Sequence, residues 1–361
     1  MSKDKISACG GCAKKTSIGG QALIEGIMMR GPEYSAMAVR DPDGKIVLEK
    51  WRTTAKFNGK FFKLPFIRGI FNFIDSMASG YKCLMRSAEI AGFEDDEPKK
   101  NSENNGTSKE AAPEKVDFSV ADAVENDLSP KTDTIEAEKS AITEKSSTSG
   151  PLMTVLMAIS AVLGVALAIG LFMVLPTFLY DILAKAVPAF YGNRFLKSLF
   201  EGIFRIIIFL AYMLLVSRMK DIRRTFMYHG AEHKTIFCYE HGNPLTVENV
   251  RKEKRFHPRC GTSFMVLMLI VGIVVGMFIP ASIPTLLRSA IKILLLPITM
   301  GIGYELIKLA GRHDNAFTRI ISAPGMWVQH ITTIEPDDGM IECAIKAFNE
   351  VLPENEKEAN W

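Results

Sequence analysis

The longest uncharged stretch of this chain lies between Lys145 and Asp181, where 35 consecutive residues carry no charged side chain. An apolar helix of about 20 residues crosses the hydrocarbon core of a bilayer, so this stretch is long enough to span one. It excludes a chain that consists of a single soluble domain. Charged residues nevertheless make up 23% of the chain, which is too many for a protein buried entirely in lipid. We therefore expect a membrane protein with soluble parts.

Four segments are apolar and long enough to cross a membrane as helices. They cover residues 152–175, 196–216, 262–279 and 286–304. The second contains Glu201 and Arg205, four residues apart on one helical face, so we expect them to pair and lower the cost of burying charge. Thr262 or Ser263 is expected to cap the third helix.

The distribution of basic residues predicts how these helices are oriented. Ten Lys and Arg residues lie between Arg218 and Arg259, against two in residues 176–195 and none in 280–287. Basic loops stay on the cytoplasmic side of a membrane. Residues 218–261 are therefore expected to face the cytoplasm, and an even number of spans returns both termini to that side of the cell membrane.

Soluble elements are expected at the two ends of the chain. Apolar alternation on both sides of the sequence DPDG at 41–44 predicts a β-hairpin, because Pro sets φ and Gly accepts a positive φ. Residues 20–32 are typical of another strand, and residues 64–91 have the spacing of an amphipathic helix. A last helix is predicted to begin at a cap formed by Asp337 or Asp338. Its apolar stripe consists of Ile341, Ile345, Phe348 and Leu352.

Residues 93–150 contain 15 acidic and 7 basic side chains. They cannot bury enough apolar surface to become ordered, so we expect an acidic tether. The predicted fold class is an α-helical membrane protein of about four transmembrane helices with small cytoplasmic α+β elements at its N- and C-terminal ends. The predicted divisions are a disordered tail (1–18), a hairpin plus amphipathic helix (19–92), the tether (93–150), transmembrane helices 1 and 2 (151–217), a cytoplasmic loop (218–261), transmembrane helices 3 and 4 (262–305) and a cytoplasmic C-terminal segment with an amphipathic helix (306–361).

The most specific motif is H-x-x-E-H, formed by His229, Glu232 and His233. Two histidines four residues apart lie on one side of a helix and can hold one metal ion. The adjacent Glu232 carboxylate can then act as a general base. This residue order is that of the inverzincin proteases, which take a third ligand from a carboxylate farther along the chain. Glu305, at the end of the last predicted span, is the candidate for that ligand.

A second cluster, His257-Pro-Arg-Cys260, lies where the same cytoplasmic loop enters the third predicted span. Imidazole and thiolate groups both suit zinc, and Pro258 turns the chain so that His257 and Cys260 can point at one place. Without a metal, Cys260 would be a small packed residue and His257 a surface residue. Near the start of the chain, Cys9 and Cys12 are either free thiols or half of a metal clip. The predicted metal is zinc, and its candidate ligands are His229, His233, His257, Cys260 and Glu305.

Several separated motifs resemble those of one family. The segments GGQALIEGIMMRGP, PFIRGIFN, HGAEHK, HPRCGTSF and APGMWVQHITTIEP are similar, in this order, to the YqhQ-like proteins, which are bacterial multi-pass membrane proteins of unknown function. The similarity covers nearly all of the chain except residues 93–150. Some members are described as predicted metal-dependent enzymes, so the resemblance implies a membrane protein with a metal but supplies no substrate. The motif positions that carry over are His229, Glu232, His233, His257 and Cys260.

Three functions are compatible with these residues. The first is a membrane scaffold or assembly factor in which a metal site on the cytoplasmic face holds the loop in shape. The second is a metal-dependent membrane hydrolase that acts on a peptide or lipid-linked substrate with Glu232 as its base, and the third is a transporter. The expected partners are the lipid bilayer, a membrane protein and a second copy of the chain, but no nucleic acid.

Overall fold

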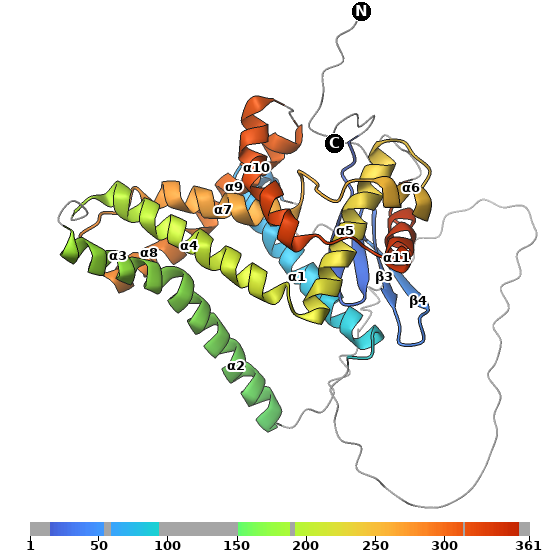
Figure 1. Ribbon diagram of the computed structural model, residues 1–361, viewed down its shortest axis with the longest axis horizontal. Helices are drawn as coiled ribbons and strands as arrows, with labels where there is room; N and C mark the ends of the chain where they lie inside the picture. Colours follow the sequence, from blue (N-terminus) through green and yellow to red (C-terminus); the bar gives the residue numbers. More distant parts are fainter. Residues whose placement is uncertain (1–14, 54–58, 94–150, 188–191, 313–314, 354–361) are drawn as a thin grey trace, which may run out of the picture. The chain divides into compact units, whose positions relative to one another are not determined.

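The computed structural model describes residues 15–53, 59–93, 151–187, 192–312 and 315–353 (Figure 1). The predicted tether, apart from its first residue, and the cysteines Cys9 and Cys12 lie outside these residues. The described part is mostly helical and has a small antiparallel sheet near the N-terminus. The arrangement described below concerns one compact unit, residues 1–94 together with 163–361.

The strands are β1 (Gly19–Leu23), β2 (Gly26–Arg30), β3 (Tyr34–Arg40) and β4 (Ile46–Arg52). The helices are α1 (Ile67–Ile90), α2 (Pro151–Ile169), α3 (Leu175–Ala186), α4 (Arg194–Val216), α5 (Lys220–Glu240), α6 (Val247–Lys252), α7 (Gly261–Gly276), α8 (Thr285–Leu294), α9 (Leu296–Arg312), α10 (Ala316–Thr332) and α11 (Asp338–Asn349). A 3₁₀ turn, η1 (Lys60–Lys63), precedes α1, and a π-helical turn, η2 (Gly170–Val174), joins α2 to α3.

The sheet is a meander in which each strand pairs with the next one in antiparallel order. The predicted hairpin is confirmed: β3 and β4 pair from Arg40 and Ile46 outward, and Gly44 in the turn has a φ of +83°. Residues 20–32 form two strands rather than the single strand expected from the sequence. The reason is a tight turn at Glu25, where a positive φ of 49° folds β1 onto β2.

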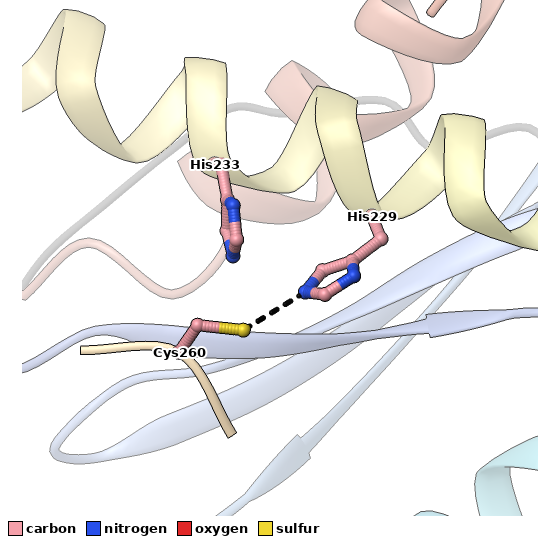
Figure 2. Close-up of side chains that lie close together, drawn as sticks. All are labelled: His229, His233 and Cys260. Atoms are coloured by element: carbon pink, nitrogen blue, oxygen red, sulfur yellow. Dashed lines mark hydrogen bonds between the residues drawn. The ribbon is translucent and has the colours of Figure 1, made fainter. Parts of the chain in front are cut away.

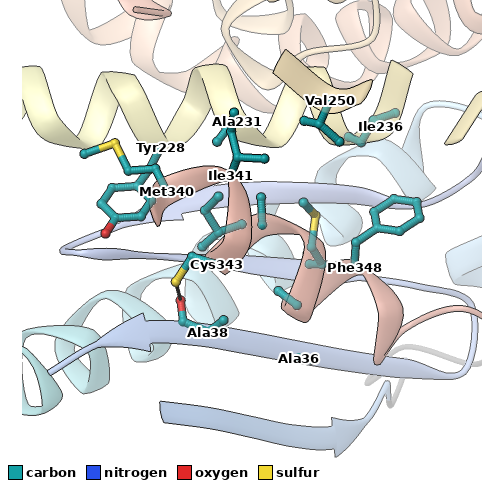
Figure 3. Packing of buried hydrophobic residues seen from close by; sticks show 14 of the residues in the cluster. Ala36, Ala38, Tyr228, Ala231, Ile236, Val250, Met340, Ile341, Cys343 and Phe348 are labelled. Carbon is teal, nitrogen blue, oxygen red and sulfur yellow. Dashed lines mark hydrogen bonds between the residues drawn. The ribbon is translucent and has the colours of Figure 1, made fainter. Parts of the chain in front are cut away.

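Both faces of the sheet are covered by helices, and the alternation of side chains explains how. Ile27 and Ala38 belong to the cluster packed against α5 and α11, and Figure 3 shows Ala38 beside Cys343 of α11. Met28 and Met37, one residue along, face α1 instead. A shift of one residue in strand pairing would exchange the two faces. Burial on both sides therefore fixes the register and holds the covering helices in one position.

The predicted C-terminal helix is confirmed as α11. Asp337 caps it by accepting a hydrogen bond from the Met340 N–H at 2.8 Å. Ile341 and Phe348 are fully buried, and burying a side chain of this size stabilises a fold by about 1.5–3 kcal/mol. Because α11 also packs against α5, the end of the chain holds the helix that carries the H-x-x-E-H motif.

Two helical segments in the described part are long and apolar enough to cross a membrane. They are Val162–Ala186, which runs from α2 through η2 to α3, and Arg194–Val216, which is α4. Helices α8 and α9 make a third candidate when they are taken together, although the chain bends by 48° between them. Helix α7 is apolar but only 16 residues long. Two or three of the four predicted spans thus have helices of suitable length.

The fourth predicted span is a broken helix rather than a continuous one. Helix α8 ends at Leu294 and α9 begins at Leu296, with Pro297 as its second residue. Proline lacks the backbone N–H that would continue the hydrogen-bond ladder of α8, so it favours the start of a new helix at this point.

The charged residues within α4 do not pair with each other, contrary to the sequence-based expectation. Glu201 instead accepts a hydrogen bond from Arg288 Nε at 3.0 Å and forms an ion pair with Lys292, both on α8. Arg205 donates from Nε to the carbonyl oxygen of Phe172 in η2 at 2.7 Å. The local pairing is lost because a distant helix brings two cations to the same carboxylate.

Helix α7 connects residues 257–260 to the helices that are candidates for crossing a membrane. Its N-cap is Cys260, whose Sγ accepts a hydrogen bond from the Thr262 N–H at 3.4 Å, so neither Thr262 nor Ser263 is the cap. The helix packs against α4, α9 and α10. Any displacement of α7 along its axis would therefore also move Cys260.

Candidate metal centre

His229 and His233 lie one turn apart on the same side of α5, and Cys260 points toward both rings (Figure 2). We refer to these three side chains as the donor group. One donor atom of each lies within 4.8 Å of the other two, and His229 Nε2 is 3.1 Å from Cys260 Sγ. Donor atoms around one tetrahedral zinc ion are about 3.5 Å apart. Small side-chain rotations would therefore allow all three to bind a single ion.

Backbone carbonyl groups fix the orientation of both histidine rings. His229 Nδ1 is 2.8 Å from the Thr332 carbonyl oxygen, and His233 Nδ1 is 2.6 Å from that of Arg255. A carbonyl oxygen only accepts hydrogen bonds, so Nδ1 carries the proton in both rings. Metal-binding histidines commonly donate their other ring N–H in this way. Nε2 is thus the ring atom left for a cation in both histidines, and at His229 a cation would displace the proton shared with Cys260.

Gly230 lets the segment that follows Thr332 lie against α5. A Cβ atom at position 230 would be 2.1 Å from the Ile334 carbonyl oxygen, which is closer than real contacts permit. The Ile334 N–H also donates to the Phe226 carbonyl oxygen at 2.9 Å. Glycine costs α5 up to about 1 kcal/mol of helix propensity, but it allows the carbonyl group that orients His229 to approach.

Cys260 and His229 shift each other's pKa within the buried site. Burial alone would raise the pKa of the Cys260 thiol, but the charges and hydrogen bonds of His229 and His233 outweigh it and hold the pKa well below its usual value. Burial would likewise lower the pKa of His229, but the Cys260 thiolate outweighs it and raises the pKa to about 9. The donor group therefore favours a thiolate, the form of cysteine that binds metals.

Glu232 is the acidic residue of the motif, and its side chain is buried beside the donor group. Its Oε2 atom has no hydrogen-bond partner among the described residues. The Gly20 backbone N–H donates to the carboxylate, and a Cβ atom at position 20 would come within 3.0 Å of the carboxyl carbon. Burial raises the pKa of Glu232. The carboxylate is thus held in place with one oxygen uncommitted and with an increased tendency to take up a proton.

A cavity of about 130 Å³ adjoins these side chains. Its walls include Glu232, His233 and Cys260, together with the segment from Thr16 to Gly20 at the start of the sheet. One water molecule occupies about 30 Å³ in the liquid, so the cavity has room for several water molecules or for the end of a small ligand. The cavity therefore leaves space next to His233 and Cys260, although both side chains are buried.

Comparison with known proteins places the chain in a family. The family described as "Protein of unknown function (DUF1385)" matches residues 64–354. The chain belongs to this family. It is also 34% identical over 356 residues to "Uncharacterized protein YqhQ" of Bacillus subtilis (strain 168), covering 98% of this chain and 95% of that protein. This similarity confirms the YqhQ-like resemblance of the sequence. No solved structure matches the chain.

In this DUF1385 member, His257 lies next to the donor group but has other partners. Its Nε2 is 3.6 Å from Glu240 Oε2, and its Nδ1 accepts the Arg259 N–H at 3.3 Å. Burial lowers the pKa of His257 to about 4, so the ring is neutral at neutral pH. The structure does not bring His257 into the group of side chains that can share one ion.

Glu305, the other ligand predicted from the sequence, is committed elsewhere. On α9 it accepts hydrogen bonds from Arg68 Nε at 2.7 Å and from the Phe66 N–H at 3.3 Å. This ion pair fastens α1 to α9 and lies outside the donor group. Among the described residues, Cys260 is the third side chain close enough to His229 and His233 to share an ion with them.

Two buried polar residues of the site were not found from the sequence. Glu240 on α5 is fully buried and forms an ion pair with Arg259. Gln329 on α10 exchanges hydrogen bonds of 2.7 Å with the backbone N–H and carbonyl group of His257. Glu240 lies two helical turns after His233, so helical spacing could have identified it. Gln329 comes from a distant helix and has no local signal.

Proposed function

We propose that this chain is an integral membrane protein with a zinc-dependent hydrolase site on its cytoplasmic face. Insertion in a membrane is supported by Val162–Ala186 and Arg194–Val216, in which only 11% of the apolar window is buried. Leu163 is 68% exposed and Leu215 is 73% exposed. Contiguous apolar surface of this kind requires a covering apolar medium, and a bilayer supplies it for helices of this length.

The cytoplasmic location of the site rests on the basic residues of 218–261, since basic loops remain on that side. An even number of spans would place both chain termini there as well. Lys252 is exposed, so a Lys252→Cys variant tests the orientation. A membrane-permeant maleimide should label this variant in intact cells more than the wild type, which has six cysteines of its own, and an impermeant one should add no label. Labelling by the impermeant reagent would overturn the assignment.

The residues present fit a zinc ion. Two imidazole nitrogens and a thiolate form the mixed nitrogen and sulfur donor set that zinc prefers. Both imidazoles of the donor group are already oriented through Nδ1, which normally accompanies metal binding. The unpartnered Oε2 of Glu232 is a buried anionic group that a neighbouring cation would compensate.

The small number of side chains that can share an ion at the donor group favours hydrolysis. A zinc ion held by these three side chains would still have room for water or a substrate, as in catalytic rather than structural zinc sites. A bound zinc ion would supply Lewis acidity to a substrate oxygen. Glu232 would accept a proton from the attacking water and pass it to the leaving group, while the Gly20 N–H holds the carboxylate in place. The adjoining cavity suits the scissile end of a peptide or lipid-linked substrate at the membrane surface.

The position of His257 carries this proposal. In a scaffold or assembly factor with a closed structural zinc site, His257 is the natural fourth ligand next to Cys260. Its commitment to Glu240 and Arg259 leaves three ligands, which supports the hydrolase over the scaffold.

Metal content tests the ligand assignment. Protein purified in neutral detergent without chelators and then supplied with zinc should hold about one equivalent, and His233→Ala or Cys260→Ser should reduce this to near zero, because two ligands retain zinc poorly. His241→Ala at the C-cap of the same helix is the matched control, since His241 pairs with Glu253 instead, and it should keep full occupancy. Wild-type protein that takes up no zinc, cobalt or other divalent metal would refute the metal site.

An open coordination position is tested with cobalt in place of zinc. Azide should change the visible spectrum of cobalt-loaded protein, and His257→Ala should leave that response intact. Glu232→Gln should also retain cobalt and the azide response but abolish complementation of a bacterial strain that lacks its own family member. A cobalt spectrum that is insensitive to azide, with full complementation by Glu232→Gln, would instead establish a closed structural site.

A further inference from the structure

A second cavity, of about 240 Å³, lies among the apolar helices. Its lining comes from η2, α4, α7, α8 and α9, and most of the lining side chains are apolar, including Phe172, Met268 and Leu296. Two cationic side chains, Arg205 and Lys292, also line it. A cavity with apolar walls and a cationic end is an unusual feature of a membrane-spanning region, where charge is costly.

Arg205 carries a buried donor that is not used. Its Nε donates to the Phe172 carbonyl oxygen at 2.7 Å, but its Nη2 has no hydrogen-bond partner among the described residues. Arg205 is the twelfth residue of the 23 in α4, so the guanidinium lies at the middle of this apolar helix. An unsatisfied guanidinium N–H at this depth is expensive unless a ligand completes it.

The charges around the cavity do not balance. Glu201 is shared between Arg288, which is fully buried, and Lys292. Lys197 is paired with Asp181 at 2.6 Å. These groups comprise four cations, with Arg205 included, and two carboxylates, which leaves an excess of two positive charges. In the interior of an apolar region such an excess calls for an anion.

The helices that form the cavity are irregular where they line it. Phe172 and Met173 belong to the π-helical turn η2, and Leu295 marks the 48° bend between α8 and α9. Irregular helical backbone within a membrane is tolerated where it lines a cavity, and π-turns and broken helices recur at binding sites. Two independent irregularities thus converge on the cavity that holds the unused donor.

We propose that this cavity binds an amphiphilic anion, with its carboxylate or phosphate group at Arg205 and Lys292 and its hydrocarbon part along the apolar walls. The bilayer can supply such a molecule as a lipid, and the aqueous phase can supply it as a short-chain acid. The site is independent of the proposed hydrolase. Gly272 in its wall lies twelve residues after Cys260, which corresponds to about 18 Å along α7, so the two sites are separate.

Binding to the full-length protein in neutral detergent tests this site, with labelled oleate, hexanoate and inorganic phosphate as probes. Arg205→Gln should weaken oleate binding about tenfold or more, which corresponds to at least about 1.4 kcal/mol. Arg194→Gln is the matched control, because Arg194 is an exposed residue of the same helix, and it should bind oleate as the wild type does. Hexanoate binding of similar strength would identify a soluble ligand, whereas binding of oleate alone would identify one from the bilayer.

A second variant fills the cavity without changing its charge. Nothing lies within 4 Å of a Cβ atom at Gly272, so Gly272→Leu should fold and should block oleate and hexanoate. Equal oleate binding by the wild type, Arg205→Gln and Gly272→Leu would overturn the proposal. So would binding of phosphate alone, or no binding of any probe.

Discussion

The two buried polar clusters of this chain are opposites in charge. In the described part of the chain, two buried side-chain atoms have no hydrogen-bond partner, Glu232 Oε2 and Arg205 Nη2. The first lies beside the donor group, where the Glu232 carboxylate and the Cys260 thiol are buried together and where we propose that a metal ion binds. The second lies among apolar helices that carry an excess of positive charge. In both regions a buried polar atom lacks a hydrogen-bond partner. The unpaired atom of Glu232 favours a cationic ligand, whereas that of Arg205 favours an anionic one.

The largest expected difference between the two regions comes from replacing one buried glutamate by glutamine in each. Glu201→Gln should destabilise the protein by about 3–5 kcal/mol, because it leaves Arg288 and Lys292 buried without a counter-charge. Glu232→Gln should cost less than about 1 kcal/mol in metal-free protein, because its carboxylate has an unsatisfied oxygen and a raised pKa. Thermal unfolding in detergent compares the two, and equal losses would remove the distinction.

A smaller effect separates the glycines of the two regions. Gly230→Ala should cost about 2–3 kcal/mol, because the new Cβ atom meets the Ile334 carbonyl oxygen and overpacked sites lose energy of this order. It should also weaken zinc binding, because the Thr332 carbonyl group that orients His229 moves away. Gly272→Ala should leave stability and zinc binding unchanged. Thermal unfolding measures the stability of each variant, and zinc titration measures its affinity for zinc. A Gly230→Ala variant with unchanged stability would contradict the packing described for α5.

The smallest effect concerns pH. Burial raises the pKa of Cys343 to about 12 from an ordinary value of 9.0, so the thiol stabilises the folded state below pH 9 and this stability declines as the pH rises from 9 toward 12. One unit above pH 9 the loss is about 1.4 kcal/mol. Cys343→Ser keeps a donor for the Ala38 carbonyl oxygen and should remove this decline. Parallel stability profiles for the two proteins between pH 8 and 10 would contradict the assignment.

The sequence predicted what is local and missed what is distant. The spacing of His229 and His233 placed both on one side of a helix, and the turn at 41–44 placed a hairpin, because both depend on neighbouring residues. Helical spacing also suggested that Glu201 would pair with Arg205, but it says nothing about which other helix approaches the same face. In the structure, α8 brings Arg288 and Lys292 to the Glu201 carboxylate.

The same limit applies to the site. Glu305 was predicted as a ligand from its position at the end of a span, yet its partner Arg68 is on a helix 237 residues earlier in the chain. His257 was predicted from its closeness to Cys260, but its ring nitrogens contact Glu240 and the Arg259 N–H instead. Charge and spacing identify which residues can serve as ligands, and only the packing of distant elements decides which of them do.

The order of the elements along the chain has a consequence during synthesis. The sheet is complete at Arg52, but α11, which covers one of its faces, begins at Asp338, 286 residues later. At translation rates of about 5–20 residues per second, this delay is roughly 15–60 s. Throughout this time the apolar face that contains Ile27 and Ala38 is not yet covered by α11. The apolar helices leave the ribosome before α11 does. The nascent sheet therefore needs protection from aggregation until α11 emerges.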